Sequence, residues 1–439
     1  MPASLANQRV TVMGLGHFGG GIAVAKWLVS QGARVLVTDQ APADKLDDSL
    51  RQLAGLPIEY RLGEHRPDDF NNTDLVVASP AVPLNNRYLA AARAAGVPIT
   101  TEICLFAQRC PSKLTLGVTG TKGKSTTTSM LADILRTKYA GRVFVGGNLG
   151  KSLLEDLPAI GENDPVVLEL SSYMLEHLRA LKWSPHVAVV TMIARDHVEW
   201  HGSVEAYVAA KRAIVDHQTD DDFVVLNLTC RTADDFARHT RAQVKYFDTT
   251  THAPFPLALA GAHNQFNAQA AYTAASCLGV SWDDAARALR AFRALPHRLE
   301  LVHEHAGVQF YNDSIATIPE AAVAALKSFP PKRVLQIVGG HLKGDYPLED
   351  LCNTLVERAK AVLCIGEMGP VIAAMLAKST AQSAPPCYAC RDLATAVAEA
   401  KKHAIAGDIV LLSTGCKSYD QFPNFEVRGD EFTRLVREN

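Results

Sequence analysis

Residues 114–128 combine glycines, a lysine and a serine at a spacing suited to phosphate chemistry. The apolar run Leu114–Val118 is typical of a buried strand, and apolar residues after Ser125 recur with helical spacing. The loop between them contains Gly120, Thr121, Lys122, Gly123, Lys124, Ser125 and Thr126. Its glycines allow backbone N–H groups to face phosphates, Lys124 can reach the β- and γ-phosphates, and the Ser125 hydroxyl can ligate Mg²⁺. The pattern predicts a nucleoside triphosphate site, in a loop two residues shorter than usual.

A carboxylate and further basic residues follow the next predicted strands. The strand Val166–Leu170 is apolar except for one glutamate, which is costly to bury unless it is paired or binds a metal. The strand Val187–Ile193 leads into an acidic and histidine-rich turn, and a helix over Ser203–Val215 follows. The polar residues that these segments carry are Glu169, Asp196, His197, His201 and Lys211. The alternation of strands and helices predicts a mostly parallel sheet with helices on both faces.

The N-terminal segment has a glycine-rich turn between a strand and a helix. The strand Arg9–Met13 precedes Gly14, Gly16 and Gly19, and a second strand ends at Asp39. This is the dinucleotide fingerprint, with an acid placed for a ribose hydroxyl. Alone it would favour an NAD-dependent oxidoreductase, but it equally fits another pyrophosphate nucleotide such as a UDP-sugar.

The C-terminal third predicts another doubly wound α/β layer. Expected strands cover residues 308–311, 334–338, 361–365 and 408–413, and polar residues gather where these strands end. Pro319 suits the first turn of a helix.

Composition narrows the class of protein. The 439 residues are 48% hydrophobic and 21% charged, with a net charge of −2, so no basic field indicates nucleic acid or an anionic membrane. No apolar run approaches the roughly 20 residues of a membrane helix. Nine scattered cysteines indicate reduced thiols in the cytoplasm, and the pair Cys387 and Cys390 lacks the second pair that a zinc site would need.

The order of these motifs resembles the Mur ligases, the ATP-dependent amino-acid ligases of peptidoglycan precursor synthesis. The resemblance spans the whole chain and rests on residues 118–126, 147–150, 168–173, 196–197, 261–264, 295–298, 312–314, 339–340, 418–422 and 424–429. It implies three α/β domains: a Rossmann-like UDP-binding domain over 1–110, a central ATP-binding domain over 111–296 and a Rossmann-like amino-acid-binding domain over 297–439. The shortened phosphate loop is the form that this family has.

The resemblance also implies roles for individual residues. Ser125 and Glu169 match ligands of one Mg²⁺, and His197 with Lys211 as a carbamate match ligands of a second, whereas His201 is expected to be structural. Residues implied near the UDP substrate are Gly14, Leu15, Gly16, His17, Asp39, Ala81 and Asn148. Those implied near ATP, besides the loop, are Asn264, Arg298 and Asp313. Those implied around the incoming amino acid are Thr317, Lys343, Ser418 and Phe425; the catalytic set is Lys124, His197, Lys211 and Lys343.

The activity implied is ADP-forming ligation of glutamate to UDP-N-acetylmuramoyl-L-alanine through an acyl phosphate, by a cytoplasmic monomer. Two departures bear on this expectation. Ile315 stands where the family commonly has lysine, and Lys122 where asparagine is usual. The D enantiomer of glutamate is expected, and addition of L-glutamate or of another amino acid stays open. From other classes, an NAD-dependent oxidoreductase and a noncatalytic sensor of cell-wall precursors also stay open.

Overall fold

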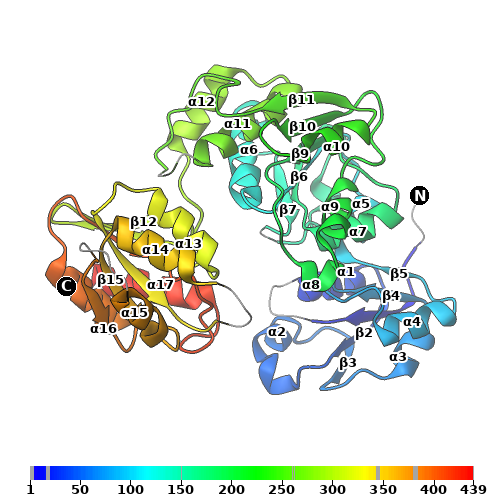
Figure 1. Cartoon of the computed structure of the whole chain (residues 1–439). Helices are drawn as coiled ribbons and strands as arrows, with labels where there is room; N and C mark the ends of the chain where they lie inside the picture. The colour runs from blue at the N-terminus through cyan, green and yellow to red at the C-terminus, as the bar shows by residue number, and fades with distance from the viewer. Residues whose placement is uncertain are drawn as a thin grey trace. The chain divides into compact units, whose positions relative to one another are not determined.

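The chain forms two compact units in a computed structural model that describes residues 4–15, 20–149, 151–259, 261, 263–342, 347–378 and 384–438. The first unit comprises Met1–Pro256 with Phe266–Arg290, and the second Leu257–Gln265 with Ala291–Asn439. The first unit contains two sheets and the second contains one, and helices flank all three (Figure 1). The predicted class, an α/β protein with three sheets, is confirmed.

The N-terminal sheet is parallel, with the strand order β3-β2-β1-β4-β5. Its central strand is buried after its first residue, as an apolar strand covered on both faces must be. The strands are β1 (Arg9–Met13), β2 (Arg34–Asp39), β3 (Ile58–Leu62), β4 (Leu75–Ala78) and β5 (Ile99–Thr100). The helices are α1 (Gly20–Ser30), α2 (Asp47–Gln52), α3 (Pro67–Asn71), α4 (Arg87–Ala94) and α5 (Glu102–Ala107).

The central sheet is also parallel and has the order β11-β10-β9-β6-β8-β7. The strands are β6 (Thr115–Thr119), β7 (Phe144–Gly147), β8 (Val166–Glu169), β9 (Val187–Val190), β10 (Phe223–Asn227) and β11 (Gln243–Phe247). The helices are α6 (Lys124–Tyr139), α7 (Ser172–Ala180), α8 (Val198–His201), α9 (Val204–Arg212), α10 (Ala233–Arg238), α11 (His263–Cys277) and α12 (Trp282–Ala291). Because β8, β6 and β9 are adjacent, the loops that follow them share one edge.

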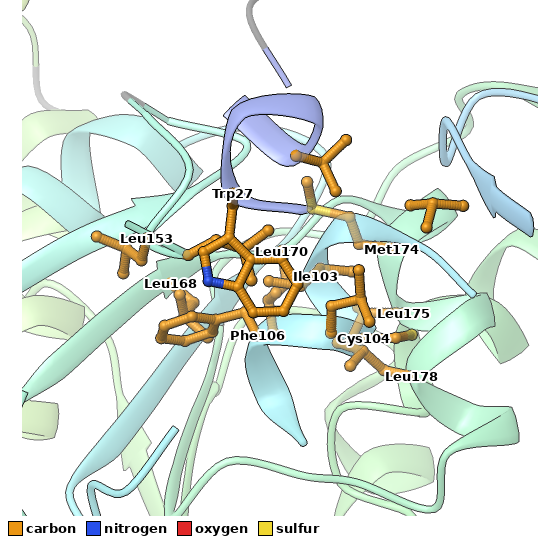
Figure 2. Close-up of a cluster of buried hydrophobic side chains, with 14 of the residues drawn as sticks. Trp27, Ile103, Cys104, Phe106, Leu153, Leu168, Leu170, Met174, Leu175 and Leu178 are labelled. Carbon is orange, nitrogen blue, oxygen red and sulfur yellow. The ribbon is translucent and has the colours of Figure 1, made fainter. Parts of the chain in front are cut away.

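One continuous hydrophobic core joins the two sheets of the first unit. Trp27 of α1 and Phe106 of α5 pack with Leu168 and Leu170 at the end of β8 (Figure 2). Trp27 is 4% exposed and Phe106 1% exposed. Burying a side chain of this size contributes about 1.5–3 kcal/mol. The strand that carries Glu169 is therefore held by apolar contacts with the N-terminal sheet.

The third sheet forms the second unit and has the order β12-β13-β17-β14-β15-β16. Only β12 runs antiparallel to its neighbour. The strands are β12 (Glu300–His305), β13 (Val308–Asn312), β14 (Val334–Gly339), β15 (Ala359–Ile365), β16 (Cys387–Ala389) and β17 (Ile409–Leu412). The helices are α13 (Pro319–Lys327), α14 (Glu349–Arg358), α15 (Gly369–Ala377), α16 (Leu393–His403) and α17 (Phe425–Arg437). Separate apolar clusters cover its two faces.

Several expected elements end earlier than predicted, β9 and α9 by the most residues. Strand β9 ends at Val190 rather than Ile193, because the Thr191 hydroxyl donates to the carbonyl oxygens of Thr119 and Lys122 and turns the chain toward the phosphate loop. Helix α9 ends at Arg212 rather than Val215. In the described ranges, no helix has the length and apolarity that crossing a membrane requires. All nine cysteines lie in those ranges, and none forms a disulfide.

Candidate active site

The phosphate loop follows the central strand β6 and opens helix α6. Gly123 precedes the helix with φ +87°, a left-handed conformation that favours glycine. A Cβ atom at this position would lie 2.5 Å from Asn267 Oδ1, so only glycine fits without displacing that side chain. The tight turn leaves the first backbone N–H groups of α6 without helical partners, as an anion site requires.

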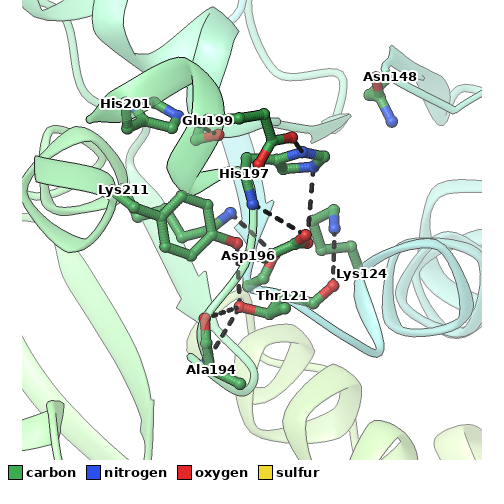
Figure 3. Close-up of polar contacts among 12 residues, drawn as sticks. Thr121, Lys124, Asn148, Ala194, Asp196, His197, Glu199, His201 and Lys211 are labelled. Atoms are coloured by element: carbon green, nitrogen blue, oxygen red, sulfur yellow. Dashed lines mark hydrogen bonds and ion pairs between the residues drawn. The ribbon is translucent and has the colours of Figure 1, made fainter. Parts of the chain in front are cut away.

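Side chains of the loop and of α9, with the backbone after β9, hold the loop in place. The Thr121 hydroxyl donates to the Ala194 carbonyl oxygen at 3.1 Å and accepts from the Ala194 N–H at 2.9 Å. It also lies 3.0 Å from the Tyr207 hydroxyl of α9. The Lys124 ammonium donates to the Thr121 carbonyl oxygen at 3.2 Å (Figure 3). The loop and the segment after β9 are thus held together before any ligand binds.

Glu169 closes strand β8 as a buried carboxylate that is only partly satisfied. Its side chain is 1% exposed, and Oε1 accepts from Asn148 Nδ2 at 2.8 Å. The second oxygen, Oε2, is buried and has no hydrogen-bond partner. Gly147, beside Asn148, has φ +86°, and a Cβ there would lie 2.3 Å from the Glu169 carbonyl oxygen. A buried carboxylate oxygen without a donor is costly unless a cation binds it.

Lys211 is buried next to the phosphate loop. It is 2% exposed, and its Nζ donates to the Gly120 carbonyl oxygen at 2.9 Å. Nζ also lies 4.8 Å from the centre of the Tyr207 ring. Burial, and secondarily the charge of Lys124, lower the pKa of Lys211 well below 10.5. The lowered pKa makes the neutral amine, which is the nucleophilic form of lysine, more accessible than it is in an exposed lysine.

His197 stands at the turn between β9 and α8. It adopts φ +48°, its N–H donates to Asp196 Oδ1 at 3.0 Å, and its ring Nε2 lies 3.5 Å from Asp196 Oδ2. The Tyr173 ring of α7 packs 5.2 Å from the imidazole, centre to centre. Figure 3 places the imidazole above Asp196 and on the same side as the Lys124 side chain. The His197 side chain is 41% exposed, so its imidazole is accessible to a metal ion or substrate that enters from solvent.

His201, expected to be structural, has packing partners of its own. Its Nε2 lies 2.9 Å from the Ser172 hydroxyl, and its ring stacks on Tyr173. Burial, followed by the nearby charges of His197 and Lys211, lowers the pKa of His201. In Figure 3 it lies on α8, away from Asp196 and Lys124. These contacts agree with a packing role.

Four of the residues predicted for the UDP substrate lie at the carboxyl edge of the N-terminal sheet: Gly14, Leu15, Asp39 and Ala81. Asp39 Oδ2 accepts from the Leu15 N–H at 2.8 Å, and Gly14 has φ +89°. Gly16 and His17 lie outside the described residues. The Ala81 carbonyl oxygen accepts from Trp200 Nε1 of α8 at 3.2 Å. A hydrogen bond thus links this edge to the helix that begins one residue after His197.

In the second unit, Asp313 lies inside rather than on the surface. It is 5% exposed; Oδ1 accepts from the Leu299 N–H at 3.1 Å and Oδ2 from the Ser413 hydroxyl at 2.7 Å. Burial raises the pKa of Asp313 to about 7. Arg298 is half-buried nearby and contributes a lesser, lowering effect on that pKa. Contact of Asp313 and Arg298 with ATP stays a prediction.

A buried arginine connects the loops predicted to hold the amino acid. Arg428 is 1% exposed; Nε donates to the Ser314 hydroxyl, Nη2 to the Ser314 carbonyl oxygen and Nη1 to the Cys416 carbonyl oxygen, at 2.9, 2.7 and 3.1 Å. Ser314 in turn donates to the Phe425 carbonyl oxygen at 2.8 Å. Burial lowers the pKa of Arg428 to about 10. The guanidinium thus links two loop segments, after β13 and after β17, to the helix α17 that carries it.

The other predicted residues are placed as follows. Ser418 is buried, Thr317 is half-buried, and Asn264 is buried at the start of α11. Ser125 is half-buried in the first turn of α6, Thr126 is buried behind it, and Lys122 is exposed. Lys343 lies outside the described residues. The roles of all these side chains stay predictions.

The residues of the central edge fit a magnesium nucleotide. The loop provides backbone donors and Lys124 for phosphates, and Glu169 Oε2 is a buried anionic oxygen without a partner. Hard oxygen donors are the ligands that Mg²⁺ prefers. In the part of the chain that the structure describes, no group of three or more His, Cys, Asp or Glu could hold a metal alone. The Glu169 oxygen and the loop are the groups that would hold such a nucleotide.

Sequence reasoning missed the residues that support this edge. Thr191, Tyr207 and Asn267 had no predicted role, although they contact the phosphate loop. Arg428 belonged to a recognised motif but had no role. Threonine, tyrosine and arginine in such positions carry no pattern of their own, and only the tertiary contacts reveal them.

The fold and the central edge define a phosphate-loop α/β protein with a site suited to a nucleotide. Family models for the Mur ligase MurD-like N-terminal domain, the Mur ligase middle domain and the Mur ligase glutamate ligase domain match residues 8–101, 118–254 and 297–416. The chain belongs to the Mur ligase family.

Relatives of similar length support this membership. The chain is 43% identical to UDP-N-acetylmuramoylalanine–D-glutamate ligase of Roseiflexus sp. (strain RS-1), covering 98% of this chain and 99% of that protein. It is 36% identical to the enzyme of the same name from Symbiobacterium thermophilum, covering 98% of each. Among solved structures, UDP-N-acetylmuramate–alanine ligase MurC from Thermotoga maritima has a TM-score of 0.64 at 20% identity, covering 98% of this chain and 99% of that one. MurF ligase of the same organism, in complex with ADP, has a TM-score of 0.59 at 18% identity, covering 100% and 99%.

Proposed function

We propose that this protein joins D-glutamate to UDP-N-acetylmuramoyl-L-alanine, with ATP converted to ADP and phosphate, in peptidoglycan precursor synthesis. The observation that carries the proposal is the central edge, where a glycine loop with Lys124 adjoins the unpartnered oxygen of Glu169. Relatives named for this activity, which match over nearly the whole chain, support the choice of substrate.

The first chemical step requires a substrate carboxylate to approach the γ-phosphate of ATP and yield an acyl phosphate. Two anions must meet, so the site has to supply positive charge. Mg²⁺, when bound, would neutralise phosphate charge and polarise a phosphoryl oxygen. Ser125 and Glu169 would hold one ion. Lys124 and the N–H groups at the start of α6 would stabilise charge on the phosphate oxygens and orient the γ-phosphate.

His197 and Lys211 would hold the second proposed ion. The Lys211 amine, whose pKa is lowered by burial, can add to CO₂ with loss of one proton to solvent, which gives an anionic carbamate. This converts a group of the wrong charge into an oxygen ligand. Tyr173 packs against His197 and would orient its imidazole.

The amine of the incoming amino acid would then attack the acyl carbon, and phosphate would leave. Ser418, Thr317 and the backbone near Phe425 are proposed to hold the carboxylates of glutamate, together with Lys343. Two fixed carboxylates and one directed amine define three points, so they distinguish enantiomers.

ADP release in the presence of UDP-N-acetylmuramoyl-L-alanine and a panel of amino acids tests the proposal. D-Glutamate should give the highest kcat/KM. Release that depends on no amino acid would contradict ligation, and NADH binding without competition by UDP would favour an oxidoreductase.

L-Glutamate is the second candidate, because Ile315 removes a cation from the predicted amino-acid site. The two enantiomers should be compared in the same steady-state assay. A tenfold preference for L-glutamate, about 1.4 kcal/mol in the transition state, would overturn the assignment of D-glutamate. We further propose that the enzyme acts as a monomer in the cytoplasm, and sedimentation at assay concentration would test its oligomeric state.

A further inference from the structure

Two cysteines of the third sheet lie close together, away from the residues discussed so far. Cys364 is on β15, and Cys387 begins β16, the edge strand next to it. Their Sγ atoms are 3.5 Å apart. Cys364 is buried at 1% exposure, whereas Cys387 is exposed. Cys387 is therefore the residue of the pair that solvent reaches, and the Cys364 sulfur lies in contact with its sulfur from the buried side.

The pair differs from the other sulfur atoms around it. Cys352 contacts Met375 at 4.0 Å within the core, and Cys390 is half-buried and turns back to β15 through its N–H, which donates to the Cys364 carbonyl oxygen at 2.8 Å. In the described ranges, these thiols do not form a group that could hold a metal ion. Thiol chemistry is therefore the use that this arrangement favours.

We propose that Cys364 and Cys387 form a modification site for small disulfides, with Cys387 as the attacking thiol and Cys364 as the resolving thiol. The Cys387 thiolate attacks one sulfur of the reagent disulfide. A new bond forms to Cys387, the reagent S–S bond breaks, and one thiolate leaves with the electron pair. Cys364 then loses its proton to solvent and attacks Cys387, which releases the second thiolate. Two protein thiols are oxidised and one reagent disulfide is reduced to two thiols.

The contact between the two sulfurs supports this division of roles. The Cys364 S–H, donating to Cys387, lowers the pKa of Cys387, and the same hydrogen bond together with burial raises the pKa of Cys364. Each unit of pKa lowering raises the thiolate fraction at neutral pH about tenfold and costs about threefold in nucleophilicity, a net gain of about threefold. Cys387 should react first, and Cys364 more slowly.

The register of the strands makes the second step the slower one for a further reason. Cys387 lies opposite Val362, whereas Cys364 lies opposite Ala389. Formation of the internal disulfide therefore requires the strands to shift along each other. The three-residue edge strand β16 pairs only with β15 and has the fewest hydrogen bonds to lose.

The shift would reach the loops at the carboxyl edge of the sheet. Glu367 follows β15 closely; its carboxylate lies 2.8 Å from His341 Nδ1, and its N–H donates to the Asp420 carboxylate at 3.0 Å. Asp420 is two residues from Ser418. An effect on amino-acid binding rests on the proposed function, whereas the thiol chemistry does not.

The test uses the full-length reduced protein, freed of reductant and exposed to glutathione disulfide. Intact mass and peptide mapping should show a mixed disulfide at Cys387 and then an internal Cys364–Cys387 disulfide. Cys364→Ala should stop at the mixed disulfide, and Cys387→Ser should lower the labelling rate at least about threefold. Cys390→Ser, the matched control, should behave as the unmodified chain does.

Three outcomes would overturn the proposal: equal labelling of Cys387→Ser and the unmodified chain, a disulfide between Cys387 and Cys390, or a mixed disulfide in the unmodified chain that persists without resolution. Cys387 is exposed, so its serine variant should fold even if Cys364→Ala does not. If the protein forms the disulfide but has no ligase activity, the proposed function is refuted and the proposed thiol chemistry still holds.

Discussion

The carboxyl edges of the central and third sheets are built from similar residue types but differ in how completely they are satisfied. At the central edge, Glu169 retains an unpartnered oxygen and Lys211 is a buried amine with a lowered pKa. At the third edge, Asp313 and Arg428 are just as buried, yet each carboxylate oxygen and each guanidinium nitrogen has a hydrogen-bond partner in its own unit.

This difference indicates that the buried charges of the two edges have different roles. Unsatisfied buried charge costs stability and is retained where a ligand supplies the missing partner. Satisfied buried charge fixes loops in one arrangement. We therefore expect the chemistry at the central edge, and we expect the buried charges of the third edge to hold the loops of its own unit. Substitutions at the central edge should lower the rate of the reaction, whereas substitutions at the third edge should lower the stability of the second unit.

Lys124→Ala should have the largest effect on rate. The substitution removes the ammonium proposed to stabilise phosphate charge, and losing one such contact costs about 10²–10³ in kcat. ADP release measures it, with a thermal melt to confirm folding. Lys138→Ala is the matched control, because Lys138 is exposed in the last turn of the same helix, α6, and should change turnover little. Near-normal turnover of a folded Lys124→Ala protein would refute the role of the loop.

Lys211→Ala should lower turnover about 10–100-fold through loss of metal binding. Small carboxylic acids added to the assay should restore part of the activity by occupying the carbamate position. Lys211→Arg should lose turnover to at least the same extent, since a guanidinium does not form a carbamate. Full activity of Lys211→Arg would exclude the carbamate. Lys211 would then be a structural buried charge, like those of the third edge.

Arg428→Met should destabilise the second unit by about 3–5 kcal/mol, because buried acceptors lose their donors. All four tryptophans lie in the first unit, so tryptophan fluorescence would not report unfolding of the second unit. Hydrogen exchange of amides 312–316 and 414–418 is therefore the suitable measurement. Arg434→Met on the same helix is the control; Arg434 pairs with Glu431 at the surface, and such pairs contribute about 0–1 kcal/mol. Unchanged exchange in Arg428→Met would mean that the network does not hold these loops.

Asp313 should make the stability of the second unit depend on pH. Its pKa is about 7 in the folded chain, against 3.8 as the ordinary value, so the folded state binds more protons between these limits. The free energy of unfolding should therefore fall as pH rises from about 4 to 7, by a few kcal/mol at most, and level off above. Hydrogen exchange at several pH values should show this slope, and Asp313→Asn should flatten it. An equal slope in both proteins would assign the effect to another group.

Trp200→Phe should have the smallest effect. It removes the hydrogen bond to the Ala81 carbonyl oxygen, worth about 0.5–1.5 kcal/mol, so KM for the UDP substrate should rise about two- to tenfold with little change in kcat. Steady-state kinetics with saturating ATP measures both constants. A large fall in kcat would instead place Trp200 among the residues that orient His197.

Much of the central edge was predictable from the sequence, because the phosphate loop, Glu169 and Lys211 lie in motifs with a fixed order along the chain. The strands before these motifs were also predictable from apolar runs. Strands β3, β7 and β11 were not, since their exposed or glycine-containing sequences lack a clear apolar period. The inward orientation of Asp313 could not be predicted either. It depends on the Ser413 hydroxyl, which is 100 residues away in sequence and adjacent only because β13 pairs with β17.

Gly147 has a consequence for how this protein tolerates genetic change. It has no side chain and takes part in no proposed step, yet any Cβ there would collide with the backbone of Glu169. In a library of all single substitutions screened for growth, position 147 should therefore be as intolerant as a metal ligand. Such a screen would therefore report Gly147 as essential, although it contributes no functional group and is required because a side chain does not fit there.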